Sequence, residues 1–459
     1  MNNKTKIILV LIVLLISLVL QVFLASKDTA LLWDENAYLA NAKSYFEPVN
    51  YDEDFRFPFL ELYIVPVWFV FGISDFSAHL VVILFSVGTL FLFYLVSKFY
   101  IKRWRVSFSL LVFLAFSKLF LFWSFRVYTD IPSIFFFLLS WYLFLYHWKY
   151  KQRNNWLLFF SGMAAIFAFN TRFPAGGCLF LGVILLCYKE WNRLLYFALG
   201  VISILVPWSI RNIILYGNPM WDFFAQYSVI ATYNATQPLS VLLLFIYVSF
   251  GLSLLFIPFS FIKLFKERSS KNYQSLILFV LVLIPYYFFF VSLKLERYVI
   301  ALFPILLLLV GIGLEYISSL KLFNEKNYLY LLYFVFGLFL ILTLVSNGVV
   351  FFKDEKSVVY CQTNSSLQQS IDYAKEHILP SDLIISNAWP WFGYYGNFRV
   401  LAPWTDDVDE LLIYEKIHAW LFMYSKYDLY SQTLMDKGSC FKNFTDSCGY
   451  TVTLCRLEK

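Results

Sequence analysis

Five arginines lie at the ends of long apolar segments, outside the basic loops that join those segments. They are Arg56, Arg126, Arg172, Arg211 and Arg297. A guanidinium group is always charged and can donate two parallel hydrogen bonds to a phosphate group. Extension of the side chain to lipid headgroups explains any one of these arginines. Five on one side of a membrane instead favour a binding site for a phosphate group that is attached to a lipid.

Two acidic motifs accompany the arginines. Asp34 and Glu35 in "LLWDENAY" follow the first apolar segment, and Asp130 follows "FRVYT" just before Pro132. Each motif could simply start a helix, with Asp34 as the N-cap residue of a helix that begins at Glu35, and Asp130 as the cap of the next one. A carboxylate beside cations that bind phosphate can also act as a general base. Both interpretations fit the sequence.

The composition indicates the elements that must position these residues. With 60% hydrophobic and only 14% charged residues, the chain is predicted to be an α-helical polytopic membrane protein. The first apolar run exceeds the apolar core of a signal peptide, so we expect it to be retained as a helix. About eleven spans are predicted, near residues 7–25, 77–97, 106–123, 131–147, 156–170, 174–188, 194–210, 239–262, 274–292, 298–317 and 327–350.

The basic loops set the predicted orientation. Lys4 and Lys6 fall on the same side as "KFYIKRWR", "HWKYKQR", "KEWNR", "KLFKERSSK" and "KLFNEK" if the spans alternate. The positive-inside rule then puts the N-terminus in the cytoplasm and the C-terminus outside, in a protein of the plasma or cytoplasmic membrane. The net charge of +6 thus reflects topology, and no nucleic-acid partner is predicted.

Two domains are expected. Residues 1–350 form the membrane domain, with Asp34 and Glu35 in a first outer loop over residues 26–76. Residues 351–459 form a small extracytoplasmic α/β domain, in which "SLQQSIDYAKEHIL" has helical spacing and "DLIIS" and "YTVTLCRL" have the pattern of strands.

The C-terminal domain holds four of the six cysteines, which lie on the oxidising side in this topology. Two disulfides in one of three pairings, or four reduced thiols, are both compatible with the sequence. A zinc site is less favoured because no CxxC spacing occurs. The four cysteines are Cys361, Cys440, Cys448 and Cys455, and N-glycosylation sequons occur at Asn234, Asn364 and Asn443.

The order of six motifs resembles a known superfamily. The motifs are "WDENAYLANAKSYF", "RFPFLELYIVPVWFVFG", "RVYTDIPSIFFFLLSWYLF", "FAFNTRFPAGGCLFLGVIL", "VPWSIRNIILYGNPMWDFF" and "LERYVIALFPILLLLVGIGL". In this order they are similar to the GT-C membrane glycosyltransferases of the protein O-mannosyltransferase and aminoarabinose transferase superfamily. The resemblance covers roughly residues 7–317, and its most specific parts are the "PWSIRN…GNP" and "ERY…FP" blocks.

The resemblance implies a reaction and roles for residues. Members of the superfamily move a sugar from a polyprenyl or dolichyl phosphate carrier to an acceptor outside the membrane, with inversion at the anomeric carbon. Asp34 matches the catalytic base, Glu35 is its partner or substitute, and Asp130 lines the same cavity. The sequence departs from the pattern after Arg56, where Phe57 replaces the first proline of a Pro-Pro-Leu run.

The resemblance also implies a binding site for the donor. Arg211 with Asn212 in the "RN" block and Arg297 with Tyr298 in the "RY" block match residues that hold the carrier phosphate, and the other three outward arginines complete the cationic surface. The implied partners are the lipid-linked sugar donor, a protein, glycan or lipid acceptor, and the bilayer. Trp33, Tyr38, Trp208 and Trp221 are candidates for stacking on the sugar.

No obligatory metal is predicted. Glu53 and Asp54 in the "DEDF" run of the first outer loop keep a divalent metal open.

Three other classes of protein share some of these features. A transporter is disfavoured because the ionisable residues gather on one face and no internal repeat is found. A polysaccharide ligase or polymerase normally has a large outer loop between late spans, whereas here the soluble mass is C-terminal. A noncatalytic binding protein is the third alternative, if the acids are only helix caps.

Overall fold

The computed structural model describes residues 2–27, 31–46, 56–150, 154–232, 237–291, 294–319, 337, 366–379, 382–396, 398–401, 419–425, 435, 438–446 and 449–457. Its contacts divide the chain into two compact units. The first comprises Met1–Ala25, Phe55–Leu60 and His79–Ser346, and the second comprises Ser26–Asp54, Glu61–Ala78 and Asn347–Lys459.

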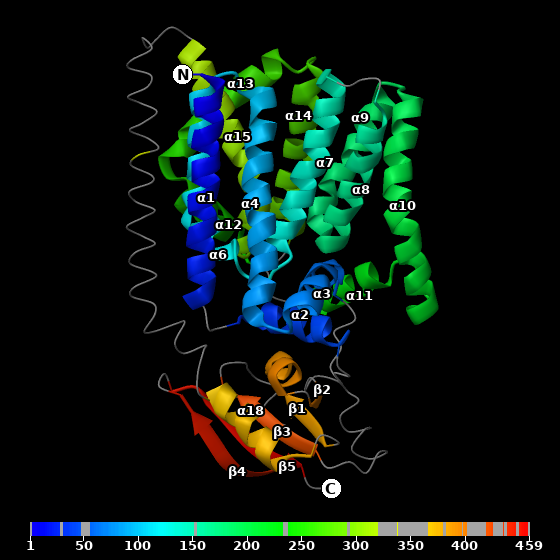
Figure 1. Ribbon diagram of the computed structural model, residues 1–459, viewed down its shortest axis with the longest axis vertical. Helices are drawn as coiled ribbons and strands as arrows, with labels where there is room; N and C mark the ends of the chain where they lie inside the picture. The colour runs from blue at the N-terminus through cyan, green and yellow to red at the C-terminus, as the bar shows by residue number, and fades with distance from the viewer. Residues whose placement is uncertain are drawn as a thin grey trace. The chain divides into compact units, whose positions relative to one another are not determined.

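The first unit is a bundle of apolar helices, several of which run roughly parallel (Figure 1). Seven helical segments in the described part of the chain are long and apolar enough to cross a membrane: Asn3–Lys27 (α1), Asp75–Tyr100 (α4), Asp130–Tyr150 (α7), Trp191–Tyr216 (α10), Leu239–Lys266 (α12 to α13), Asn272–Phe290 (α14 and η3) and Arg297–Ser319 (α15). The fifth segment consists of Leu239–Phe250 (α12), Gly251–Phe256 (η2) and Ile257–Lys266 (α13), and the sixth of Lys271–Pro285 (α14) and Tyr286–Phe290 (η3). Shorter apolar helices cover Phe59–Phe71 (α3), Trp104–Phe116 (α5), Trp156–Thr171 (α8) and Phe173–Cys187 (η1 and α9). The protein is therefore an integral membrane protein.

Every predicted span up to residue 317 falls on these helices, and the last one, 327–350, lies outside the described residues except for Gly337. The span predicted over 106–123 is two helices, α5 and Lys118–Trp123 (α6). The break is at Ser117, whose backbone is extended and whose hydroxyl accepts a hydrogen bond from the Phe120 N–H. This N-cap starts a new helix inside an apolar run that gave no sign of a break.

Small residues and hydroxyls bring neighbouring helices of the bundle together. A Cβ atom on Gly162 of α8 would lie 2.0 Å from the Phe197 carbonyl oxygen of α10, and one on Gly200 of α10 would lie 2.0 Å from the Phe159 carbonyl oxygen. Close packing of this kind is typical of helix pairs in membranes. On the other side of α8, the Ser161 hydroxyl donates to the Ser140 carbonyl oxygen of α7 at 2.8 Å.

The second unit contains a five-stranded mixed sheet in the order β2-β1-β3-β5-β4. The strands are Leu383–Ser386 (β1), Arg399–Leu401 (β2), Ala419–Tyr424 (β3), Gly438–Thr445 (β4) and Thr451–Leu457 (β5). β1 pairs in parallel with β2 and β3, and β5 pairs antiparallel with β3 and β4. Ser366–His377 (α18) packs against β4 and β5 (Figure 1). The predicted helix and both predicted strands are confirmed.

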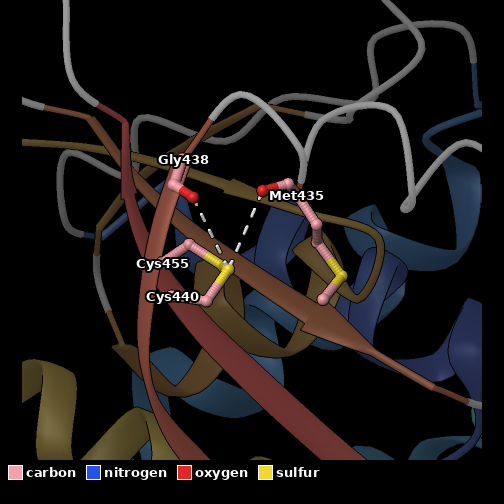
Figure 2. The surroundings of a disulfide bond; sticks show 4 residues. All are labelled: Met435, Gly438, Cys440 and Cys455. Atoms are coloured by element: carbon pink, nitrogen blue, oxygen red, sulfur yellow. Dashed lines mark hydrogen bonds between the residues drawn. A yellow bond between two sulfur atoms is a disulfide. The ribbon is translucent and has the colours of Figure 1, made fainter.

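One disulfide of this unit links Cys440 to Cys455 across the neighbouring strands β4 and β5 (Figure 2). This disulfide belongs to one of the three pairings that are compatible with the sequence. Cys361 and Cys448 lie outside the described residues. Asn443 of the third sequon is exposed on β4. The other two sequon asparagines also lie outside the described residues.

The predicted outer loop contains two helices. Trp33–Lys43 (α2) carries Asp34 and Glu35, and α3 follows it. The apolar helix α3 has only 13 residues and contains Pro66. It is shorter than a membrane span, so no span was predicted here from the sequence. α2 and most of α3 belong to the second unit, together with the C-terminal sheet.

Candidate active site

Glu35, and not Asp34, makes the capping contact at the start of α2. The helix begins at Trp33 after Leu32, and the Glu35 carboxylate accepts a hydrogen bond from the Leu32 N–H at 2.7 Å. In a capping box, the side chain of the third helical residue accepts a hydrogen bond from the N–H of the N-cap residue, and Glu35 makes this contact here. The prediction that Asp34 is the N-cap of a helix starting at Glu35 is therefore wrong, because the helix starts two residues earlier. Asp34 lies within the first turn, where the helix dipole favours a negative charge.

The two acids of α2 differ in burial. Glu35 is fully buried and is engaged by the backbone, whereas Asp34 is half-buried. α2 is also fixed to α3, because the Asn41 side-chain amide donates to the Glu61 carboxylate at 3.0 Å. Asp34 is thus the more accessible acid of this motif.

In the first unit, Asp130 forms a buried ion pair. Its carboxylate lies 2.8 Å from Nη1 of Arg172, and the two side chains are 1% and 15% exposed. Asp130 is the first residue of α7, so its carboxylate serves the ion pair instead of capping the helix as predicted. The same Arg172 nitrogen contacts the Thr129 hydroxyl at 3.4 Å. A buried carboxylate that neutralises an arginine is poorly placed to take a proton from a substrate.

Arg297 and Tyr298, at the start of α15, join this pair. The guanidinium groups of Arg172 and Arg297 lie 5.3 and 5.8 Å from the centre of the Tyr298 ring, and Arg297 also lies 5.2 Å from the ring of Tyr128. The two guanidinium groups repel each other electrostatically, and Asp130 attracts Arg172. Four predicted site residues, Asp130, Arg172, Arg297 and Tyr298, are therefore together in the structure.

Arg211 and Asn212 form a second cluster near the end of α10. The Arg211 guanidinium lies 4.4 Å from the Trp208 ring and donates to the Asn212 side-chain oxygen at 2.9 Å. Asn212 and Trp208 donate in turn to one oxygen of the buried Asp222 carboxylate, at 2.9 and 2.6 Å. Within the described residues, no carboxylate comes within ion-pairing distance of Arg211.

The two cationic clusters lie on neighbouring elements. Phe173, next to Arg172, contacts Phe223, next to Asp222, with ring centres 4.9 Å apart. Asp222 is a site residue that the sequence analysis missed, although it lies in the quoted "GNPMWDFF" motif. Its position shortly after Pro219 and Met220 was the only feature in the sequence that marked Asp222, and this position does not indicate a functional role.

The remaining predicted cations have other surroundings. Arg126 is buried, with its guanidinium 5.0 and 5.5 Å from the rings of Phe122 and Phe125. Arg56 is half-buried just before α3. Lys294, which the sequence analysis did not single out, donates to the Tyr287 and Phe288 carbonyl oxygens at 3.0 Å each and so caps the end of η3.

The aromatic candidates for sugar stacking are mostly occupied by protein. Trp208 lies beside Arg211, and Trp221 stacks on Tyr216 with ring centres 5.1 Å apart. Tyr38 is buried. In the described part of the chain, no group of three or more His, Cys, Asp or Glu side chains could hold a metal ion. Glu53 and Asp54 lie outside that part, so the prediction about a metal stays a prediction.

Comparison with known proteins identifies the fold. Residues 58–210 match the family model of dolichyl-phosphate-mannose-protein mannosyltransferases, a segment that includes Asp130 and Arg172. The structure is similar to that of ArnT from Cupriavidus metallidurans bound to undecaprenyl phosphate, with a TM-score of 0.64 and 14% identity over 99% of this chain and 98% of that one. The apo state of the same ArnT gives a TM-score of 0.65 over 98% and 97% of the two chains at 14% identity.

A second structural relative is an oligosaccharyltransferase. The archaeal AglB from Archaeoglobus fulgidus, solved with an inhibitory peptide and a dolichol-phosphate, has a TM-score of 0.55 and 11% identity over 96% of this chain and 74% of that one. No curated protein shows significant sequence similarity. The chain has the fold of the GT-C membrane glycosyltransferases, and the resemblance predicted from the motif order is confirmed.

Proposed function

We propose that the protein is an inverting glycosyltransferase that moves a sugar from a polyprenyl or dolichyl phosphate carrier to an acceptor hydroxyl on the outer face of the membrane. The fold supports this class of enzyme, since ArnT was solved with undecaprenyl phosphate and AglB with a dolichol-phosphate. The acceptor hydroxyl belongs to a protein, a glycan or a lipid.

The observation that carries the proposal is the state of Arg211. Its guanidinium group is half-buried over Trp208, and the nearby Asp222 carboxylate is occupied by Trp208 and Asn212. An arginine in an apolar surrounding needs an anion or water to offset the cost of its charge. The phosphate group of a lipid carrier supplies that anion and presents oxygens that a guanidinium can bind in pairs.

Arg172 and Arg297 extend the cationic surface. Asp130 compensates one of their two charges, so the three side chains together keep a net positive charge. A preorganised positive charge stabilises the phosphate as it leaves with the bonding electrons. Since the leaving phosphate is stabilised in this way, the reaction does not require a general acid.

Asp34 is the proposed general base. The acceptor oxygen attacks the anomeric carbon from the face opposite the phosphate, the bond from that carbon to the phosphate oxygen breaks, and the Asp34 carboxylate takes the acceptor proton. The half-burial of Asp34 and the engagement of Glu35 with the Leu32 N–H support this choice.

The proposed orientation puts the N-terminus in the cytoplasm and the C-terminal sheet outside. The Cys440–Cys455 disulfide supports it, because disulfides persist in oxidising compartments and are rare in the cytosol.

Asp34→Asn tests the proposed function. Purified protein in liposomes is given undecaprenyl phosphate and dolichyl phosphate carrying labelled sugars, and sugar transferred to a panel of hydroxyl acceptors and to water is counted. Asparagine preserves the size of the side chain but cannot take the proton, so transfer should fall about 10²- to 10⁴-fold while carrier binding stays unchanged. Transfer near the wild-type rate would remove Asp34 from this role. Transfer from neither carrier by the wild-type protein would refute the proposed reaction.

A further inference from the structure

We propose that the short helical turn Trp389–Gly396, "WPWFGYYG", of the second unit is the positioning element that holds α2, and with it Asp34, in place for the reaction. This turn consists of Trp389–Trp391 (α19) and Phe392–Gly396 (η4). This inference rests on the proposed function, in which Asp34 is the base. It assigns a positioning role in the transfer reaction to a segment about 350 residues away in the chain. The residues of this segment act through α2.

The N-terminal end of α2 is held by two tryptophans of this turn. The ring of Trp33, the residue just before Asp34, meets Trp389 edge-on with ring centres 4.5 Å apart and Trp391 with centres 5.3 Å apart. Both turn tryptophans are buried, at 5% and 7% exposure. Edge-to-face aromatic pairs have a preferred geometry, so this clamp fixes where the first turn of α2 lies as well as stabilising it.

The C-terminal end of α2 is held by the same turn. The Lys43 ammonium group, in the last turn of the helix, donates to the Tyr394 carbonyl oxygen at 3.1 Å. α2 therefore contacts one short segment at both of its ends. A helix held at one end can still swing, whereas contacts at both ends fix its direction.

The turn is itself anchored within the second unit. The Tyr394 and Tyr395 hydroxyls both donate to the carboxylate of Asp75, the latter at 3.1 Å. The Tyr394 ring lies nearly parallel to that of Trp68 of α3, with centres 6.5 Å apart. Burial raises the pKa of Tyr394 above its ordinary value, and the negative charge of the nearby Asp75 carboxylate raises it further. The Tyr394 phenol therefore stays protonated and can donate its hydrogen bond.

α2 needs such support because of its length. It has 11 residues, and helices shorter than about 12–15 residues are marginal in water without packing partners. A displacement of about 1 Å in a reacting group can lower a rate by about 10²-fold. Loosening the turn should therefore slow transfer by displacing α2.

Two variants test the inference from opposite ends of α2. Trp391→Leu removes half of the aromatic clamp, and Lys43→Met removes the contact with the Tyr394 carbonyl while leaving the turn intact. Trp420→Leu is the matched control, because Trp420 lies in β3 and contacts Arg456 of β5 and Phe441 of β4. Each is measured for kcat, for the KM of the sugar-loaded undecaprenyl phosphate or dolichyl phosphate, whichever the wild-type protein uses, and for melting temperature.

Trp391→Leu and Lys43→Met should lower kcat roughly 10- to 100-fold with the donor KM changed by less than about twofold, whereas the control should keep the wild-type kcat. In an Asp34→Asn background the same two substitutions should change the residual rate by less than about twofold, since the helix then carries no base to position. Equal losses in both backgrounds, or a wild-type kcat for both variants, would overturn the inference. If Asp34→Asn alone transfers normally, the assignment of the base fails instead.

Discussion

Replacing Arg211 by methionine should weaken binding of the carrier phosphate far more than it weakens the fold. A hydrogen bond from a charged donor contributes about 1.5–3 kcal/mol, which corresponds to roughly a tenfold to hundredfold rise in Kd. The fold loses less. Arg211 has no carboxylate partner in the described residues, and its contact with the Trp208 ring contributes about 0.5–1 kcal/mol. Its hydrogen bond to the Asn212 oxygen is also lost, but Arg211 is half-buried and water can replace that bond.

The measurement is a titration of the purified variant with radiolabelled undecaprenyl phosphate and with dolichyl phosphate, at low and at physiological salt. Arg193→Met is the matched control on the same helix. Its guanidinium pairs with Glu190 at 2.9 Å near the other end of α10, and a partly exposed pair of this kind contributes about 0–1 kcal/mol. The control should therefore bind the carrier like the wild-type protein.

The reasoning fails if Arg211→Met binds both carriers with wild-type affinity and melts at the wild-type temperature. Arg211 would then be an interfacial arginine that extends to lipid headgroups. A weakened titration accompanied by an equally large loss in Arg193→Met would point to a general loss of positive charge, with no specific phosphate contact.

Three further outcomes are expected. Asp130→Ala leaves Arg172 buried without its carboxylate and should destabilise the first unit by about 3–5 kcal/mol in chemical unfolding, with most of the loss recovered when Arg172→Met is added. Cys440→Ser opens a disulfide between residues separated by 15 positions and should cost about 3 kcal/mol in the sheet, seen as earlier unfolding, with the buried Cys455 thiol reacting with maleimide as the sheet unfolds. A reporter fused after Lys459 should be active outside the cell, and protection of the intact tail from protease in right-side-out cells would contradict that orientation.

The helices were predictable because apolar length is a strong signal. The run over residues 7–25 is longer than the apolar core of a signal peptide and was predicted as a retained helix, and the strand at Thr451–Leu457 shows a clear alternation of apolar and polar residues. The break at Ser117 and the helix α3 were not predictable, since both depend on local events within apolar sequence. A single serine accepts a cap hydrogen bond in one case, and a proline-containing run is too short to register as a span in the other.

The site was predictable in its residue types and less so in its partnerships. Asp130, Arg172 and Arg297 were predicted as site residues from the sequence, and they lie together in the structure. The sequence did not indicate that Asp130 pairs with Arg172, which is 42 positions away. Asp222 was missed for the same reason: its role is defined by Trp208 and Asn212 of the preceding helix. A single sequence shows the periodicity of helices and strands, but it has no pattern that indicates contacts between residues far apart in the chain.

The partners of the acids narrow the choice of base. Asp130 is committed to Arg172, Asp222 to two hydrogen-bond donors, and Glu35 to the N–H that precedes α2. A carboxylate that already accepts such bonds is a weaker base, because hydrogen bonds to the charged form favour that form. Asp34 shares the first turn of α2 with Glu35 and is half-buried. In the proposed mechanism the two adjacent acids divide two tasks: Glu35 accepts the N–H at the start of the helix, and Asp34 is the base.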